Sequence, residues 1–90
     1  MMRISRLYYF KIVAKNLSFT KAAKECHISQ PALSKQISLL ENTLGFPVFD
    51  RNAGRIRLTP AGKAYYESVC HLLEQFESSL CSLQVDIHEL

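Results

Sequence analysis

The chain has 90 residues, of which 48% are hydrophobic and 21% charged, and its formal net charge is +3. That length allows one small domain with a modest core and excludes a large enzyme. The sequence has no apolar run of about 18 residues that would span a membrane, and its first residues lack the apolar stretch of a signal peptide, so we expect a cytoplasmic location.

Two short helices are predicted in the first 26 residues. The segment "SRLYYFKIVAKN" has apolar residues at three- and four-residue spacing, with Ser5 as a candidate N-cap. The segment "SFTKAAKE" follows, with Ser18 as a candidate N-cap. We expect Ala22 and Ala23 on its inner face, where their small size lets another helix approach closely.

A third helix is predicted after the turn "CHI", in the segment "SQPALSKQISLLENTLG". Pro31 suits the first turn of a helix, either Ser29 or Gln30 can serve as N-cap, and Gly45 suits a left-handed C-cap. Two helices joined by a three-residue turn form a helix-turn-helix. The turn has no glycine, so we expect His27 to supply its left-handed bend.

The next segment, "FPVFDRNAGRIRLT", predicts a two-stranded hairpin. Val48 and Phe49 are typical of a short strand, "RNAG" contains turn formers, and "RIRL" alternates charged and apolar side chains. Arg51, Arg55 and Arg57 lie on or near this hairpin. A basic hairpin after a helix-turn-helix is typical of a wing.

The last segment predicts one long helix. Thr59 is a candidate N-cap, and Pro60 suits the first helical position. A single helix of about 30 residues would be about 45 Å long. Apolar residues alternate spacings of three and four and form a coiled-coil seam. The seam consists of Tyr66, Val69, Leu73, Phe76, Leu80, Leu83, Ile87 and Leu90. Because the small body cannot cover it, we expect a second copy to pair with it, and the dimerisation residues are Val69, Leu73, Phe76, Leu80, Leu83 and Ile87.

The charge is distributed unevenly along the chain. Residues 1–63 contain all 11 basic residues and three acidic ones, a net charge of +8, whereas residues 64–90 contain five acidic residues and no Lys or Arg, a net charge of −5. A strongly basic body predicts a polyanionic partner, and the acidic tail should point away from it.

The third helix has an apolar stripe at helical spacing, formed by Leu33, Ile37, Leu40 and Leu44. Its opposite face carries short polar side chains and one lysine. A helix fits the major groove of duplex DNA, where each base pair displays a distinct pattern of donors and acceptors. Gln30 can bond two edge atoms of adenine, and Lys35 can reach guanine acceptors or a phosphate. Pro31 or Ala32 can pack on a thymine methyl group. The predicted major-groove residues are Gln30, Pro31, Ala32, Ser34, Lys35 and Ser38.

The hairpin arginines predict contacts outside the major groove. A narrow A·T minor groove has an enhanced negative potential that attracts a guanidinium. Arg55, beside Gly54, is the residue we place at the hairpin tip. Arg51 is expected to hold a phosphate or to brace the wing, and the role of Arg57 stays open.

Catalysis and metal binding are not indicated by the sequence. His27, His71 and His88 lie in different predicted elements, and no HExxH, GxSxG or Gly-rich phosphate loop is present. The spacing of the three cysteines matches neither a zinc ribbon nor a disulfide framework. We therefore expect no enzyme activity, no metal and no cofactor.

Residues 18–51, "SFTKAAKECHISQPALSKQISLLENTLGFPVFDR", and the later "RLTPAG" carry a family resemblance. With the apolar positions of the first helix, they strongly resemble, without gaps, the N-terminal DNA-binding domain of LysR-type transcriptional regulators. Cys26 and Val48 stand where leucine is usual, which keeps both positions apolar. The resemblance implies a mainly α fold: a winged helix-turn-helix of three helices and a two-stranded wing at residues 1–59, then a linker and dimerisation helix at residues 60–90.

The resemblance also assigns roles to particular positions. It implies that Gln30, Pro31, Ala32, Ser34 and Lys35 line the major-groove surface and that Arg51 and Arg55 contact DNA from the wing, and we add Ser18 and Thr20 as backbone contacts. Such regulators bind partly palindromic promoter sites, often as tetramers, and normally continue into a C-terminal effector-binding domain. That domain is absent from the 90 residues, so we expect either an excised DNA-binding fragment or a naturally short protein.

The leading hypothesis is sequence-specific binding of double-stranded DNA as a homodimer, as the DNA-binding part of a bacterial transcriptional regulator. The alternative is a dimerisation or inhibitory module whose seam pairs with a full-length regulator. RNA binding is disfavoured, because the Phe and Tyr residues fall at helix-core spacings and form no platform for stacked bases.

Overall fold

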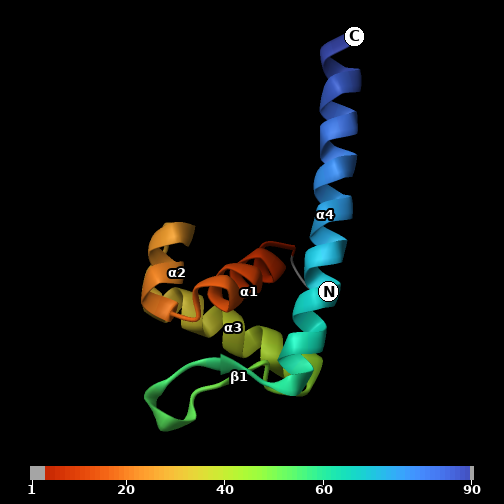
Figure 1. The fold of residues 1–90 in the computed structure, drawn as a ribbon. Coiled ribbons are helices and arrows are strands. Elements are labelled where there is room, and N and C mark those ends of the chain that lie inside the picture. The colour runs from red at the N-terminus through yellow and green to blue at the C-terminus, as the bar shows by residue number, and fades with distance from the viewer. Residues whose placement is uncertain (1–3, 90) are drawn as a thin grey trace.

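The computed structural model describes residues 4–89, without the side chains of Ala53 and of residues 82–89. Within that range the elements are α1 (Ile4–Asn16), α2 (Phe19–Cys26), α3 (Gln30–Leu44), β1 (Phe49–Asp50), the 3-10 helix η1 (Asn52–Gly54), β2 (Arg57–Leu58) and α4 (Pro60–Glu89). In Figure 1, α1, α2 and α3 form a body, the hairpin lies below it, and α4 rises beside it and projects well beyond it. The predicted winged helix-turn-helix followed by a long helix is confirmed.

Local caps set the boundaries of the first two helices. The hydroxyl oxygen of Ser18 accepts the N–H of Lys21 at 3.1 Å and caps α2, as predicted. His27 then adopts the left-handed conformation (φ 59°, ψ 38°), which confirms its role in the turn. Leu17, between α1 and α2, is left-handed as well (φ 49°), which no sequence signal indicated. The prediction that Ser5 caps the first helix is wrong, because α1 already includes the residue before it.

Two caps also define α3. The hydroxyl oxygen of Ser29 accepts the N–H of Ala32 at 3.2 Å, which decides the N-cap in favour of Ser29 over Gln30. Pro31 therefore occupies the first turn, where its missing N–H costs no intrahelical bond. At the other end, Gly45 (φ 82°) forms the predicted left-handed C-cap.

One hydrophobic core joins α1, α2, α3, the wing and the first turns of α4. Phe10 is fully buried, and its ring centroid lies 5.5 Å from that of Phe49 and 5.3 Å from that of Tyr65. Other side chains with no exposed surface come from α1, α2, α3 and α4 and from the residue directly before β1. They are Val13, Ala22, Leu33, Ile37, Leu40, Val48 and Leu73. The apolar stripes predicted for the first three helices therefore form the core.

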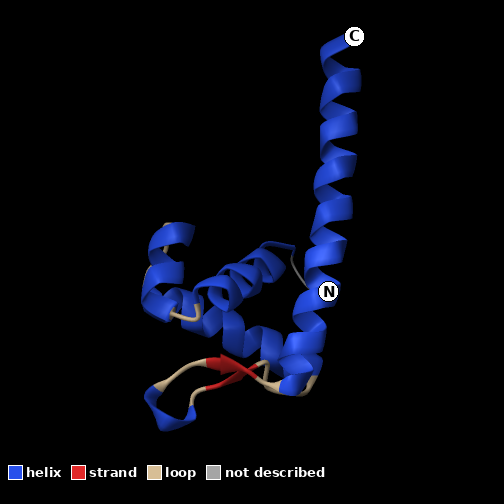
Figure 2. Cartoon of the chain, in the orientation of Figure 1, coloured by secondary structure: helices blue, strands red, loops and turns tan. Residues whose placement is uncertain are grey.

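The wing is a minimal antiparallel hairpin. Phe49 pairs with Leu58, and Asp50 pairs with Arg57. Figure 2 shows the two short strands in red and the 3-10 helix within the loop that joins them. The predicted hairpin is confirmed, but its strands are shorter than expected, and Val48 precedes the sheet instead of belonging to it.

Hydrogen bonds to backbone groups attach the wing to its neighbouring helices. The Glu41 carboxylate on α3 accepts the N–H of Val48 at 2.8 Å, and the Val48 carbonyl accepts the N–H of Thr59 at 3.0 Å. The Thr59 hydroxyl donates to the Pro47 carbonyl at 2.8 Å and accepts the N–H of Gly62 at 2.9 Å, which confirms Thr59 as the cap of α4. A Cβ at Gly62 would overlap the Val48 carbonyl, so only glycine permits this approach.

The first half of α4 packs on the body, and the rest extends past it. Val69 and Leu73 are buried in the core. The Tyr8 hydroxyl on α1 donates a hydrogen bond of 2.9 Å to the Glu77 carboxylate on α4. The two residues are 69 positions apart in the sequence, so this bond links the first helix to the last. The projection of α4 makes the molecule 54 Å long in its largest dimension. Among the described residues, no helix combines the length and the apolar character that crossing a membrane requires.

Candidate nucleic-acid interface

The exposed face of α3 is polar along its N-terminal half. Leu33 and Ile37 turn inward and are fully buried. The predicted major-groove residues occupy the other side of the helix. Gln30, Pro31, Ala32, Lys35 and Ser38 are exposed, and Ser34 is half-buried. The structure therefore places the six residues on the outward side of the N-terminal half of α3, where the helix dipole favours a negative charge.

Thr20 and Gln30 meet across the helix-turn-helix. The Thr20 hydroxyl donates to Oε1 of Gln30 at 3.1 Å, in a part of the surface that is exposed to solvent. A hydroxyl has one proton, so in this arrangement Thr20 has none left for a phosphate. In the free chain Thr20 thus contacts the neighbouring major-groove residue, and its predicted contact with the DNA backbone stays a prediction.

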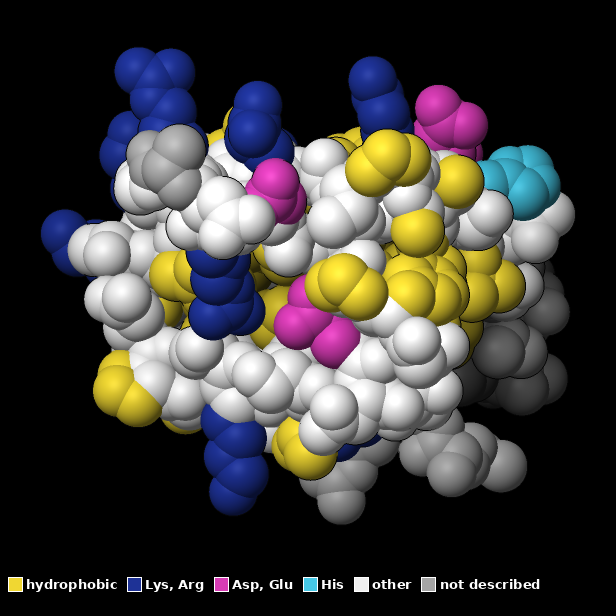
Figure 3. Space-filling view, turned by 90° about the horizontal axis from the view of Figure 1, so that it is seen from below, with side chains coloured by type: hydrophobic (Ala, Val, Ile, Leu, Met, Phe, Trp, Pro, Cys, Tyr) yellow, Lys and Arg dark blue, Asp and Glu magenta, His cyan; other side chains and the backbone are white. Residues whose placement is uncertain are grey.

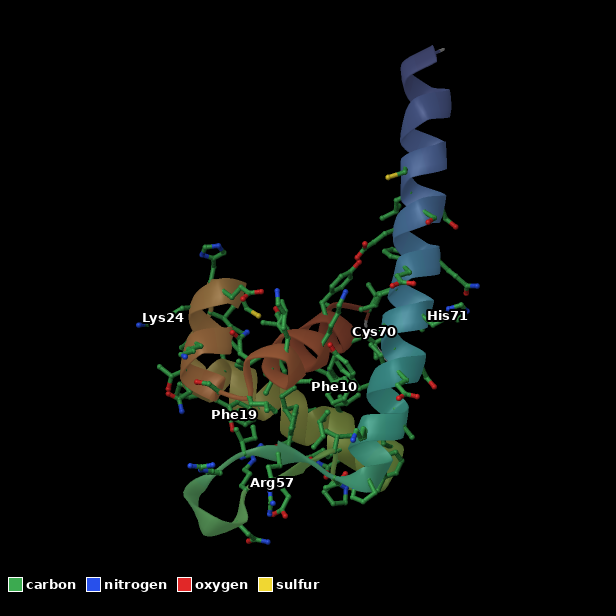
Figure 4. All side chains as sticks on the ribbon, in the orientation of Figure 1. Phe10, Phe19, Lys24, Arg57, Cys70 and His71 are labelled. Carbon is green, nitrogen blue, oxygen red and sulfur yellow. The ribbon has the colours of Figure 1, made fainter. Side chains whose placement is uncertain are left out.

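The wing arginines differ in their surroundings. Arg51 lies over the ring of Phe19, with its guanidinium carbon 4.5 Å from the ring centroid, which fits a cation–π contact. Arg57 lies 3.8 Å from the Asp50 carboxylate in a pair whose side chains are 68% and 34% exposed, and such surface pairs contribute little stability. Figure 4 shows Phe19 on the side of the body that faces the wing, and Arg57 on the wing itself.

A shallow groove brings together two predicted DNA contacts from distant parts of the sequence. Its volume is about 500 Å³, and it is lined by Leu17, Ser18, Gly54, Arg55, Ile56 and Arg57. The Ser18 oxygen accepts a backbone N–H, which leaves the hydroxyl proton to donate outward. Ser18 and the exposed Arg55 therefore border a groove with donors suited to a phosphate. Arg55 directly follows the 3-10 helix that forms the hairpin tip.

The wing also borders a second groove of about 650 Å³, which is lined by Arg51, Asn52 and Arg57 together with Asp50, Thr59 and apolar residues. Viewed from below, Lys and Arg side chains project from several points of the surface, and acidic side chains are few (Figure 3). This distribution agrees with the basic charge of residues 1–63.

The predicted dimerisation seam divides into two parts. Val69 and Leu73 belong to the core of this chain, so they are not available to a partner, and their assignment to a dimer contact is wrong. Phe76 is half-buried and Leu80 is 41% exposed. Leu83 and Ile87 lie in the part of α4 whose side chains are outside the described residues. Leu72, which the seam did not include, is 49% exposed and follows a four-residue spacing with Phe76 and Leu80.

Cys26 is partly buried at the end of α2, and His71 lies on the surface of α4. Partial burial and the neighbouring Glu25 carboxylate raise the pKa of the Cys26 thiol, which favours the unreactive protonated form. His71 projects from α4 away from the body (Figure 4) and is exposed, as expected for a surface residue. Among the residues that the structure describes, no three His, Cys, Asp or Glu side chains are grouped so that they would hold a metal ion.

Several contacts at this interface were not predicted from the sequence. They are the bond from Thr20 to Gln30, the stacking of Arg51 on Phe19, the bond from the Val48 N–H to the Glu41 carboxylate, and a hydrogen bond from Arg6 to Gln36 at 3.1 Å. Each joins residues from different elements, so no local pattern indicates the pairing. The close approach at Gly62 had a sequence signal, since a glycine in the first turn of a helix needs a packing reason.

Residues 4–63 match the family model for the bacterial regulatory helix-turn-helix protein, lysR family. The chain belongs to this family. It is 44% identical over 79 residues to the HTH-type transcriptional regulator BudR of Klebsiella aerogenes, covering 88% of this chain and 55% of the relative. It is 42% identical over 78 residues to the Hca operon transcriptional activator HcaR of Escherichia coli K12, covering 87% of this chain and 26% of the relative.

Among solved structures, the chain is similar to the BenM DNA-binding domain in its complex with benA site 1 DNA. The TM-score is 0.88 at 35% sequence identity, with 92% of this chain and 93% of that chain covered. The chain thus spans about half of one curated relative and about a quarter of the other, and nearly the whole of a DNA-binding domain.

Proposed function

We propose that the chain binds double-stranded DNA sequence-specifically as a homodimer, with α3 in the major groove and the wing on the adjacent backbone or minor groove. The observation that carries the proposal is the exposed polar face of α3, which stands beside a hairpin with three arginines. The relation to the BenM domain, which was solved with DNA, supports it.

The dimensions and side chains of α3 suit a major groove. An α-helix with its side chains is about 10–12 Å across, and the groove is about 12 Å wide. Short side chains on the outer face, such as Ala32 and Ser34, let the helix axis come close to the bases. Gln30 and Lys35 are long enough to reach base edges from there. Each well-placed bidentate contact contributes about 1–3 kcal/mol of discrimination between bases.

Backbone contacts supply the rest of the binding free energy. Arg51 has a guanidinium supported by Phe19, and Ser18 and Arg55 border one groove. Lys and Arg contacts to phosphates displace condensed counterions, which makes affinity depend on salt concentration. We therefore propose that the wing and the N-terminus of α2 position the protein on the duplex, and that α3 contacts the bases.

Dimerisation is assigned to the outer face of α4. Leu72 and Leu80 are large apolar side chains left exposed on a helix that projects beyond its own body, with the half-buried Phe76 between them. A second copy of the same helix offers the same apolar face, and a two-fold pair is the simplest closed arrangement. Such a pair presents two α3 helices to the two halves of a palindromic site.

The role assigned to the whole protein is regulation of transcription in the cytoplasm, without catalysis. The curated relatives carry the names of transcriptional regulators, one of them an operon activator. The testing experiment is selection of bound fragments from random duplex DNA. Enrichment of one palindromic sequence supports the proposal, and recovery of unrelated sequences contradicts its specific form.

A second candidate function is favoured by the same exposed leucines on α4. A chain of this kind can pair through α4 with a longer regulator and act as a dimerisation or inhibitory module. Weak half-site binding by a monomeric variant favours DNA binding as the primary function, because dimerisation then only multiplies affinity. Loss of all DNA binding on mixing with a longer regulator, with pairing intact, favours the inhibitory function.

A further inference from the structure

We infer that Thr20 is a positioning residue that fixes the amide of Gln30 and thereby sets the base preference at one position of each half-site. This inference rests on the proposed function. It begins with the hydrogen bond from the Thr20 hydroxyl to Oε1 of Gln30, 3.1 Å long, which joins the first turn of α2 to the first turn of α3.

The direction of this bond determines what Gln30 presents outward. A glutamine side chain free in solvent exposes its oxygen or its NH₂ group interchangeably. When Oε1 accepts the hydroxyl proton, the amide is held by its oxygen, and both protons of Nε2 are left for a partner. The oxygen keeps one further lone pair, so it is able to accept a second hydrogen bond.

The two elements that carry these residues are themselves fixed. Ser18 caps α2 two residues before Thr20, and Ser29 caps α3 immediately before Gln30. His27 holds the turn between the two helices in a left-handed conformation. Thr20 is β-branched, so its rotamers within a helix are few. The hydroxyl therefore meets the amide from a defined direction.

This orientation favours one kind of base edge. Adenine offers N7 as an acceptor and its N6 amino group as a donor, which match Nε2 and the remaining lone pair of Oε1. Guanine offers two acceptors, of which Nε2 can use either. Cytosine presents only a donor in the major groove, so the outward NH₂ group meets no acceptor there. The expected order of preference is adenine first and cytosine last.

The bond is exposed in the free protein, where water competes with it. At a DNA interface much of the bulk water is displaced, and a hydrogen bond strengthens as the local dielectric constant falls. The contribution of Thr20 should therefore be seen in discrimination between bases on bound DNA and not in the stability of the free chain.

The test uses the full chain and a set of four duplexes that differ only at the base pair opposite Gln30, within the sequence the wild-type chain selects from random DNA. Thr20→Val removes the hydroxyl and keeps the branched shape, and Thr20→Ser keeps the hydroxyl. Thr43→Val is the matched control, because the Thr43 hydroxyl bonds the Leu39 carbonyl within α3. Each variant is combined with Gln30→Ala in a double-mutant cycle.

We expect Thr20→Val to lower the preference for adenine over cytosine by about tenfold, which lies within the discrimination expected of one bidentate contact. Thr20→Ser and Thr43→Val should keep the preference, and Thr20→Val should have no further effect in the Gln30→Ala background. The inference is overturned if Thr20→Val leaves the preference unchanged, or if Thr20→Val has the same effect in the wild-type and Gln30→Ala backgrounds. Either result leaves the proposed function standing. A wild-type chain that selects no sequence overturns the proposed function and this inference with it.

Discussion

Arg51 and Lys35 carry the same charge in different surroundings. The Arg51 guanidinium stacks on Phe19, which belongs to α2, and so is held on the wing side of the body. Lys35 is exposed on the outer face of α3. A guanidinium fixed in this way suits a phosphate at a constant position along the duplex, whereas a lysine on the helix that faces the bases suits a base edge or the phosphate beside it.

This difference predicts two distinct mutant phenotypes. Arg51→Ala should weaken binding to all duplexes by a similar factor and should reduce the slope of log K against log salt by about 1. Lys35→Ala should weaken binding mainly at one or two base positions. Fluorescence anisotropy on a panel of single-base variants separates the two. Equal losses on every duplex for both variants would refute the division of roles.

At the scale of the element, the first turn of α4 is fixed to the wing by a close backbone approach. The Thr59 hydroxyl bonds the Pro47 carbonyl before it and the Gly62 N–H after it. Gly62, which has no side chain, leaves room for the Val48 carbonyl. The neighbouring Glu41 carboxylate bonds the Val48 N–H. Wing, α3 and α4 are thus joined at one point, so a change there should alter the stability of the domain as well as the wing.

Gly62→Ala should destabilise the domain, because the added methyl group overlaps backbone that cannot move away freely. Overpacking of this kind costs about 1–3 kcal/mol of the free energy of unfolding. Urea denaturation followed by circular dichroism measures it. The exposed neighbour Lys63 supplies the control as Lys63→Ala, with an expected change within about 0.5 kcal/mol. A Gly62→Ala chain as stable as the wild type would contradict the packing at this contact.

The elements show which features can be inferred from sequence. The caps at Ser18, Ser29 and Gly45 and the turn at His27 were predictable, because each depends on a few adjacent residues. The stripe on α3 was predictable because helical periodicity separates its buried face from its polar face. The bond from Thr20 to Gln30 was not, since it depends on the angle between two helices.

The last helix shows a different limit of prediction from sequence. The spacing of its apolar residues predicted one continuous seam, but periodicity does not tell which part of a stripe a chain covers with its own body. The structure uses Val69 and Leu73 in the core and leaves Leu72 exposed. The way in which the body packs against α4 decides this division.

At the scale of the whole molecule, the chain separates a basic body from an acidic extension. Residues 1–63 carry a net charge of +8 and residues 64–90 a net charge of −5. In Figure 1, α4 leads away from the hairpin, so its C-terminal end lies far from the wing. This arrangement keeps the acidic residues away from a bound polyanion and places the projecting half of α4 where a second copy can reach it.

Charges placed on the exposed leucines should prevent formation of the proposed dimer. Leu72→Glu combined with Leu80→Glu should give a monomer by analytical ultracentrifugation, because a second copy would then bury like charges. The monomer should keep weak binding to a half-site and lose the added affinity for a full palindrome. Gln75→Glu, at an exposed polar position of α4, is the control and should stay dimeric. A dimer that persists in the double variant would show that α4 pairs through other residues.

The central claim is that the exposed face of α3 and the basic wing bind DNA in a sequence-dependent manner. The most direct test is a titration of the chain with its selected duplex and with a scrambled duplex of equal length, at several salt concentrations. For about six phosphate contacts, log K should fall with a slope near −5 against log salt, and the selected duplex should bind more tightly at every concentration. Equal affinity for both duplexes, or an affinity independent of salt, would contradict the account.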